Sequence, residues 1–428
     1  MKKRFFKYIT QNILGMLGLS CYILADTIFI SQAEGSDGLT ALNLVLPLYS
    51  FIFAIGAMVG VGSAIRYAIA KSKKEEKKDD YLFQAVFFTF LVSIVFLLIG
   101  VFLPEKLLIF LGADARILEV GLSYTRIFLC FAPFFMWNHI ANAYVRNDNA
   151  PTVAMVATLS SSLFNILFDY IFMFPLQMGM KGAALATSLS PIVGILICCI
   201  HFFSKESSIR FKIVKPSLKE VLISARLGIS AFIGEISSGV ITLTFNYLIL
   251  GLAGNVGVAA YGVVANTAIV TNCVFNGVAQ GSQPLISEAY GKGKKENVRK
   301  YRNYSLLTAL FLAILLYAIT FLFAKEIVFV FNREQDAVLE KMAFIGIRLY
   351  FIGILFAGVN IVGGSFFSAT EQVKNAFLIS ILRGFVLILL SAFLMAALFG
   401  MNGVWLSYAL SEGITLVVFL VLLFHFKH

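Results

Sequence analysis

The chain has 428 residues, of which 59% are hydrophobic and only 13% are charged, and its mean hydropathy is +0.88. A soluble protein needs roughly a quarter of its residues charged to cover its surface, so most of this surface faces lipid. The net charge of +11 does not indicate nucleic acid, because the basic residues are dispersed among short loops. All five cysteines lie in apolar segments, which favours small buried side chains over disulfides or metal ligands.

Apolar runs long enough to cross a bilayer recur along the chain and predict an all-α membrane protein with twelve transmembrane helices. The basic start followed by an apolar run resembles a signal peptide, but the run continues past Cys21 and predicts an uncleaved first helix. The expected spans are 8–30, 39–70, 81–103, 117–141, 152–174, 182–203, 222–251, 257–288, 300–323, 337–367, 375–398 and 403–425. The spans 39–70, 257–288 and 337–367 exceed a bilayer's thickness, so we expect them to tilt, kink or extend into the cytoplasm.

Lysine and arginine gather in alternate loops. They are frequent before residue 8 and in 71–74, 205–219 and 292–302, and sparse in the loops between. Positive residues stay on the cytoplasmic side of a membrane, which predicts a multi-pass protein of the bacterial inner membrane with both termini in the cytoplasm.

The two halves of the sequence resemble each other at an offset of about 220 residues, the pattern that parallel repeats produce. The run Gly38-Leu39-Thr40-Ala41 matches Gly257-Val258-Ala259-Ala260, and 179–182 matches 400–403. An offset of six spans keeps the membrane orientation, so the repeat predicts two six-helix lobes related by a pseudo-two-fold axis along the membrane normal. We expect an N-lobe at 1–203, a cytoplasmic linker at 204–219 and a C-lobe at 220–428.

Four polar residues are expected at one depth in the N-lobe. Asp26, Asp169 and Thr187 each lie about five residues from an outer helix end, roughly 8 Å below the same surface. Asn165 precedes Asp169 by four residues and shares its helix face. Two carboxylates, an amide oxygen and a hydroxyl are hard-oxygen ligands that suit Na⁺ or a shared proton. The alternative is that these acids only bond to neighbouring helices.

Further polar residues are expected near the midplane of the C-lobe. Glu235 and Glu412 could each attract a cationic substrate, carry a proton, or pair with an arginine inside the protein. Asn272, Asn276 and Gln280, with Gln283, follow a helical spacing that indicates either a cavity-facing stripe or interhelical contacts.

No phosphate-cradling motif ending in Gly-Lys-Ser/Thr and no catalytic constellation are present, so the sequence favours ion-driven transport without a cofactor over ATP-driven transport or membrane enzymology.

Several segments together resemble the multidrug and toxic compound extrusion (MATE) family over essentially the whole chain. These are YILADTIFIS at 22–31, FNILFDYIF at 164–172, KGAALATSLS at 181–190 and LGISAFIGEISSG at 227–239. The resemblance, to the bacterial DinF/MepA-like branch, implies a cation site at Asp26, Asn165, Asp169 and Thr187. Two departures from many relatives stand out: the first proline is Pro47, outside the first helix, and the tenth helix offers Asn360 where some relatives carry an aspartate.

The sequence therefore predicts a monomeric secondary exporter of cationic, amphipathic organic molecules, exchanged for Na⁺ or H⁺ by alternating access of two lobes and surrounded by membrane lipids. The first alternative is a lipid or lipid-linked oligosaccharide flippase of the same superfamily. The acidic midplane disfavours it, since a pyrophosphate carrier is expected to present Arg or Lys. The second alternative, an integral-membrane enzyme, lacks a reactive constellation.

Overall fold

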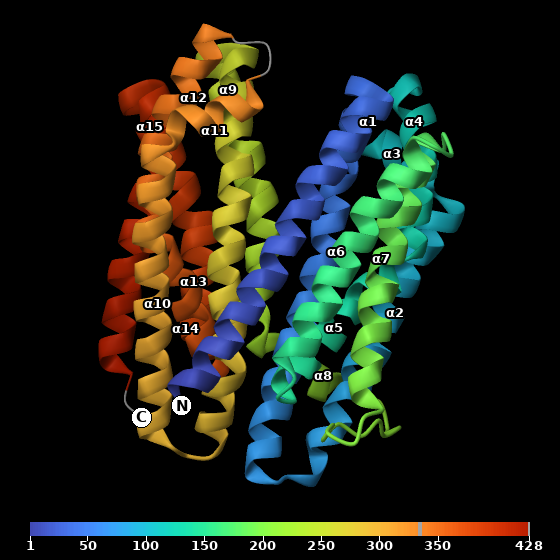
Figure 1. The fold of residues 1–428 in the computed structure, drawn as a ribbon, viewed down its shortest axis with the longest axis vertical. Coiled ribbons are helices and arrows are strands. Elements are labelled where there is room, and N and C mark those ends of the chain that lie inside the picture. Colours follow the sequence, from blue (N-terminus) through green and yellow to red (C-terminus); the bar gives the residue numbers. More distant parts are fainter. Residues whose placement is uncertain (333–335, 427–428) are drawn as a thin grey trace.

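The computed structural model describes residues 1–332 and 336–426, and within these ranges the chain is helical without strands. Two helical bundles lie side by side (Figure 1). The N-lobe contains α1 (Lys2–Lys73), α2 (Asp80–Phe102), α3 (Pro104–Phe110), α4 (Ala115–Cys130), α5 (Ala132–Asn147), α6 (Pro151–Met173) and α7 (Gly179–Phe202). After a linker, α8 (Leu218–Leu227) packs against α1 and α2 of the N-lobe. The C-lobe contains α9 (Ile229–Gly291), α10 (Lys295–Leu322), α11 (Ala324–Phe331), α12 (Ala337–Tyr350), α13 (Ile354–Ala369), α14 (Val373–Ile381) and α15 (Leu387–His425).

Three of these helices each turn back on themselves at one glycine. Gly35 in α1, Gly254 in α9 and Gly400 in α15 have φ of 62°, 64° and 57° with non-helical ψ. A side chain is strained at such angles, and glycine is not. A Cβ on Gly257 would stand 2.9 Å from Ile249, eight residues earlier, whereas eight residues of straight helix span about 12 Å. Each of the three glycines therefore joins two antiparallel spans without a loop.

This reversal decides the number of spans. Nine helical segments of the described residues are long and apolar enough to cross a membrane, with the halves of α1 already counted separately, and α4 with α5 forms a tenth span bent by 49°. The reversals in α9 and α15 add one span each, so the twelve predicted spans are confirmed. The predicted span 117–141 differs in being broken near Phe131. Pro133 at the start of α5 has no N–H, so it cannot continue the backbone hydrogen bonds of α4.

The first turns of α1 are buried in the opposite lobe. Phe5, Tyr8 and Ile9 are at most 3% exposed and pack with C-lobe residues such as Ile286 and Phe366. From there α1 crosses to the N-lobe (Figure 1). We call the end of the bundles that carries both termini the terminal end.

Contacts between the lobes concentrate at the terminal end. A Cβ on Gly277 would stand 2.6 Å from the Cα of Ile13, and one on Gly281 would stand 2.9 Å from the carbonyl oxygen of Tyr8. Glycine at both positions lets α9 approach α1 closely. Toward the other end the two bundles diverge (Figure 1).

Candidate cation and substrate site

The four N-lobe residues expected to hold a cation are brought together by three helices. Asp26 comes from the outer part of α1, Asn165 and Asp169 from one face of α6, and Thr187 from α7. Asn165 and Asp169 are fully buried, and Thr187 and Asp26 are 3% and 8% exposed. None of the four points into lipid, so the cluster lies inside the lobe.

The oxygen atoms of this cluster are largely without protein partners. The Asn165 amide donates to Thr187 Oγ1 at 3.2 Å, which directs the Asn165 carbonyl oxygen away from that bond. The carboxyl groups of Asp26 and Asp169 lie within hydrogen-bonding reach of each other. Asp26 Oδ1, both oxygens of Asp169 and Asn165 Oδ1 are buried without a hydrogen-bond donor.

Two carboxylates in contact repel each other, and a buried acceptor without a donor costs about 1–3 kcal/mol. A proton shared by the acids, or a Na⁺ ion among the oxygens, would remove both penalties. Across the described residues no group of three or more His, Cys, Asp or Glu side chains is arranged for a metal ion, so a transition-metal site is not indicated. The donor set fits a small monovalent cation.

Tyrosines enclose the cluster, and sequence reasoning missed them. The hydroxyls of Tyr22 and Tyr49 are 3.1 Å apart, and Tyr22 lies within electrostatic range of Asp26, Asp169 and Glu235. Tyr124 on α4 lies within hydrogen-bonding reach of Thr187. A signal for Tyr22 was present, since it precedes Asp26 by four residues on the same helix face.

Glu235 on α9 is an exposed carboxylate near the boundary between the lobes. Tyr22 of the N-lobe and Cys273 of α9 are within its electrostatic range. No ion pair or hydrogen bond engages its carboxylate within the described ranges. The carboxylate of Glu235 is therefore without a protein partner in the part of the chain that the structure describes.

The predicted polar stripe on α9 divides into two parts. Asn272, Asn276 and Gln280 are half-buried at intervals of four residues, while Gln283 is 4% exposed and bonds to the N-lobe. The first three line one face of α9, and the fourth is an interlobe contact.

Glu412 is buried and paired inside the C-lobe. It is 1% exposed, and Arg383 donates to its Oε1 at 2.9 Å. Asn360 donates to Oε2 at 2.7 Å and to the backbone oxygen of Glu412 at 2.9 Å. Of the roles the sequence left open for Glu412, the structure shows the buried pair with arginine. Arg383 itself lies in a π-helical turn, Leu382–Val386, between α14 and α15.

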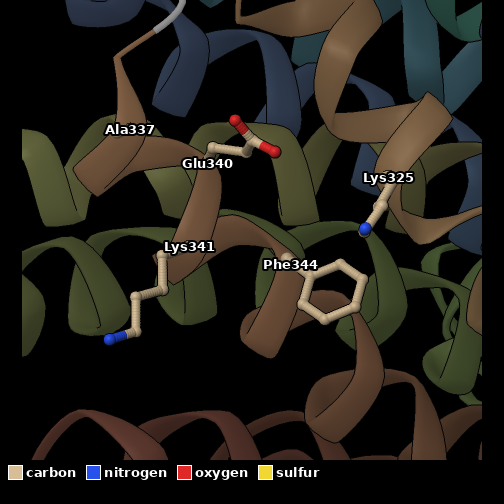
Figure 2. A pocket seen from close by; sticks show the side chains of 5 residues that line it. All are labelled: Lys325, Ala337, Glu340, Lys341 and Phe344. Atoms are coloured by element: carbon tan, nitrogen blue, oxygen red, sulfur yellow. The ribbon is translucent and has the colours of Figure 1, made fainter.

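A small surface pocket lies on the C-lobe, apart from all these groups (Figure 2). Lys325 of α11 and Ala337, Glu340, Lys341 and Phe344 of α12 line it. It contains no predicted site residue, and we assign it no part in transport.

Comparison with known proteins decides the family. The MatE family model matches residues 12–171 and 231–394, the greater part of the chain. The chain belongs to the MATE family. Both matched segments include helices of the site, the first carrying Asp26, Asn165 and Asp169 and the second Glu235.

The MATE chain is similar to two curated relatives over nearly its whole length. It is 25% identical over 418 residues to the multidrug export protein MepA of Staphylococcus saprophyticus, covering 96% of this chain and 91% of that protein. It is 26% identical over 417 residues to MepA of Staphylococcus aureus, with the same coverage. The predicted DinF/MepA-like branch is confirmed.

Solved structures of MATE proteins share the fold. A MATE structure in complex with MaL6 superposes with a TM-score of 0.92 at 22% identity, covering 98% of this chain and 95% of that one. An outward-facing multidrug resistance MATE transporter gives 0.89 at 22% identity, with 98% and 94% covered. The MATE protein described here is thus a multi-pass membrane transporter and not an enzyme, and the expected fold class is confirmed.

Proposed function

We propose that this MATE chain exports cationic, amphipathic organic molecules across the bacterial inner membrane in exchange for Na⁺ or H⁺. The observation that carries the proposal is the N-lobe cluster, where Asp26 and Asp169 are in contact and their oxygens lack donors. Such a pair needs a cation or a proton, so its occupancy is tied to the ion gradient. The name of the MepA relatives, multidrug export proteins, supports the export of drugs.

The unpaired acid on α9 supports a cationic substrate. Glu235 is exposed without a hydrogen-bond or ion-pair partner, and Tyr22 and Tyr49 offer aromatic rings on the N-lobe side. A cation near aromatic faces and one carboxylate gains both electrostatic and cation–π attraction. The flippase alternative gains no support from Glu235, because a pyrophosphate would be repelled by it. Single-chain transport by a monomer remains our expectation.

Alternating access is supported by the contacts at the terminal end. Arg4 donates to Glu288 Oε2 and to Asn149 Oδ1, both at 2.6 Å, and so links α1 to both lobes. We infer that this end faces the cytoplasm, because it carries the basic segments around Lys2 and Lys73. The structure then corresponds to a state closed toward the cytoplasm, and breaking these contacts would open the opposite state.

Dye transport into everted membrane vesicles, which corresponds to efflux from the cell, tests the proposal, with a Na⁺ gradient or a pH gradient imposed separately. We expect one gradient to drive efflux in the native protein. Asp26→Asn and Asp169→Asn each replace a carboxylate with an amide of the same shape and should abolish gradient-driven efflux. Glu119→Gln removes an exposed acid of α4 and serves as the matched control. Undiminished gradient-driven efflux in both aspartate variants would refute the proposed coupling.

A further inference from the structure

A file of buried and half-buried polar side chains runs from the cation cluster toward the terminal end, inside the N-lobe. It begins at Asn165 and Thr187, which are hydrogen-bonded to each other. Ser190 Oγ donates to the Thr187 carbonyl at 3.0 Å, and Ser161 Oγ donates to the Ser190 carbonyl at 2.7 Å. These groups link α6 to α7 below the two aspartates.

The file continues on α5. A Cβ on Gly194, one turn beyond Ser190, would stand 2.6 Å from Asn138 Oδ1, so this glycine leaves room for the Asn138 amide against α7. Asn142 donates to Asn138 Oδ1 at 2.9 Å, and Thr158 of α6 approaches Asn142 Oδ1 at 3.4 Å, a weak contact. Along α6, the eleven residues from Asp169 to Thr158 span about 16 Å, roughly half of a bilayer core.

The file ends at an arginine without a counter-charge. Arg146 lies four residues after Asn142 on α5, is 8% exposed, and packs close to Cys198 of α7. Its Nε has no hydrogen-bond partner, and no ion pair engages the guanidinium in residues 1–332 and 336–426. A charge buried in this way is costly and in membrane proteins usually functional.

The acid that follows Arg146 in the sequence does not pair with it. Asp148, two residues later, has each carboxylate oxygen occupied by other donors. These donors are the side chains of Lys71, Tyr67, His201, Ser207 and Ser208 and the backbone N–H of Ser208. The positive charge of Arg146 is therefore not balanced by an ion pair and would repel a cation in the polar file.

Arg146 is also tied to the state of the lobe interface. The next residue, Asn147, exchanges hydrogen bonds with Gln283 of the C-lobe. While the lobes are joined at this end, the last turn of α5 is held in place. When they separate, that restraint on Arg146 is lost.

We propose that this polar file is the route by which the coupling cation passes between the aspartates and the cytoplasm, apart from the substrate's route between the lobes, and that Arg146 closes it by electrostatic repulsion. The inference rests on the proposed function, since it assumes a cation at Asp26 and Asp169. The barrier stands while the lobes are joined at the terminal end, which is the state in which an open route would dissipate the gradient. Small polar side chains of this kind can pass either a proton or a partly dehydrated Na⁺ ion.

Cation flux without substrate tests the route directly. Purified protein in liposomes would be given a pH gradient, read by an enclosed pH-sensitive dye, or a Na⁺ gradient, read by radioactive sodium. We expect Arg146→Gln to raise flux of one ion roughly tenfold, the effect of removing about 1.4 kcal/mol from a barrier. Arg146→Lys keeps the charge and should leave flux at the native level.

Two further variants separate a route from damaged protein. Asn142→Leu introduced into Arg146→Gln should return flux to the native level, because it interrupts the file. Gln283→Leu keeps Arg146 but frees Asn147, and should raise flux of the same ion. Native-level flux in both Arg146→Gln and Gln283→Leu overturns the proposal, as does a leak that persists in the Arg146→Gln, Asn142→Leu protein. Loss of coupling in Asp26→Asn is a separate result, measured with substrate, so failure of the proposed function is distinguishable.

Discussion

Asn147 and Gln283 exchange reciprocal amide hydrogen bonds across the lobe interface, each 3.1 Å long. Gln283 also donates to Ser287, so its orientation is fixed within α9. Both amides are buried, at 5% and 4% exposure. If the lobes separated at this end, the amide nitrogen and oxygen of both side chains would lose these hydrogen bonds. The presence of the Asn147–Gln283 pair therefore indicates that the terminal end is closed.

A covalent link at this pair should arrest transport. Asn147→Cys with Gln283→Cys places one thiol on each lobe beside the point where the amides now meet, so a short reducible thiol-specific cross-linker can span them. We expect the cross-linker to join the lobes and reduce dye efflux to background, and reductant to restore it. The single cysteine variants treated with the same cross-linker are the controls. Full efflux from protein shown to be cross-linked would contradict alternating access by separation of the lobes here.

Two glycines between α1 and α8 should not tolerate a methyl group. A Cβ on Gly62 would stand 1.8 Å from the carbonyl oxygen of Ser224, and one on Gly228 would stand 1.9 Å from that of Met58. Backbone atoms cannot rotate away as side chains do, so overpacking should cost about 1–3 kcal/mol. We expect Gly62→Ala and Gly228→Ala to lower the melting temperature in detergent. Gly234→Ala, which has open space around its Cβ, is the matched control and should not lower the melting temperature.

Asp148 should make stability depend on acid pH. Burial alone would raise its pKa, but hydrogen bonds from Lys71 and Tyr67 outweigh burial and lower the pKa from 3.8 to about 2. The carboxylate therefore contributes its full stabilisation above pH about 4, and the contribution is lost as pH falls toward 2. The lowered pKa of Asp148 corresponds to about 2 kcal/mol of the free energy of unfolding at neutral pH.

Melting curves of the native protein and Asp148→Asn, taken from pH 7 to pH 2.5, measure this contribution. We expect the native protein to melt higher at pH 7 and the difference to shrink below pH 4. Other carboxylates titrate in both proteins and cancel in the comparison. A difference that stays constant between pH 7 and pH 2.5 would show that the lowered pKa does not account for the stabilisation.

The helices and their number could be predicted from the sequence because the apolar runs and the repeat are local signals. The breaks between spans at 31–38 and 252–256 were predicted as well, but the sequence did not predict that a single glycine, Gly35 or Gly254, would make each reversal without a loop. The depth of Asp26 and Asp169 could be counted along separate helices, which is why these residues were proposed together. Their actual proximity depends on how the helices are rotated and packed.

In the C-lobe, counting residues along the helices could not predict which side chains contact each other. Arg383 and Glu412 are 29 residues apart on different helices, and no periodicity relates them. Depth alone placed Glu412 beside Glu235 as a candidate, but only packing distinguishes an exposed acid without a partner from a buried acid paired with an arginine. The π-helical turn that carries Arg383 likewise has no sequence signature.

Glu412 and Arg383 should behave as a structural pair that can be removed together. Arg383→Met leaves a buried carboxylate unpaired, and Glu412→Met leaves a buried guanidinium unpaired; each should cost about 3–5 kcal/mol. The double substitution leaves neither charge, so we expect it to recover most of the lost melting temperature and to keep dye efflux. If Glu412 instead binds substrate, the double variant would be stable but inactive. Glu235→Gln in the same assay is the comparison, since it should weaken the apparent affinity for cationic dyes without lowering the melting temperature.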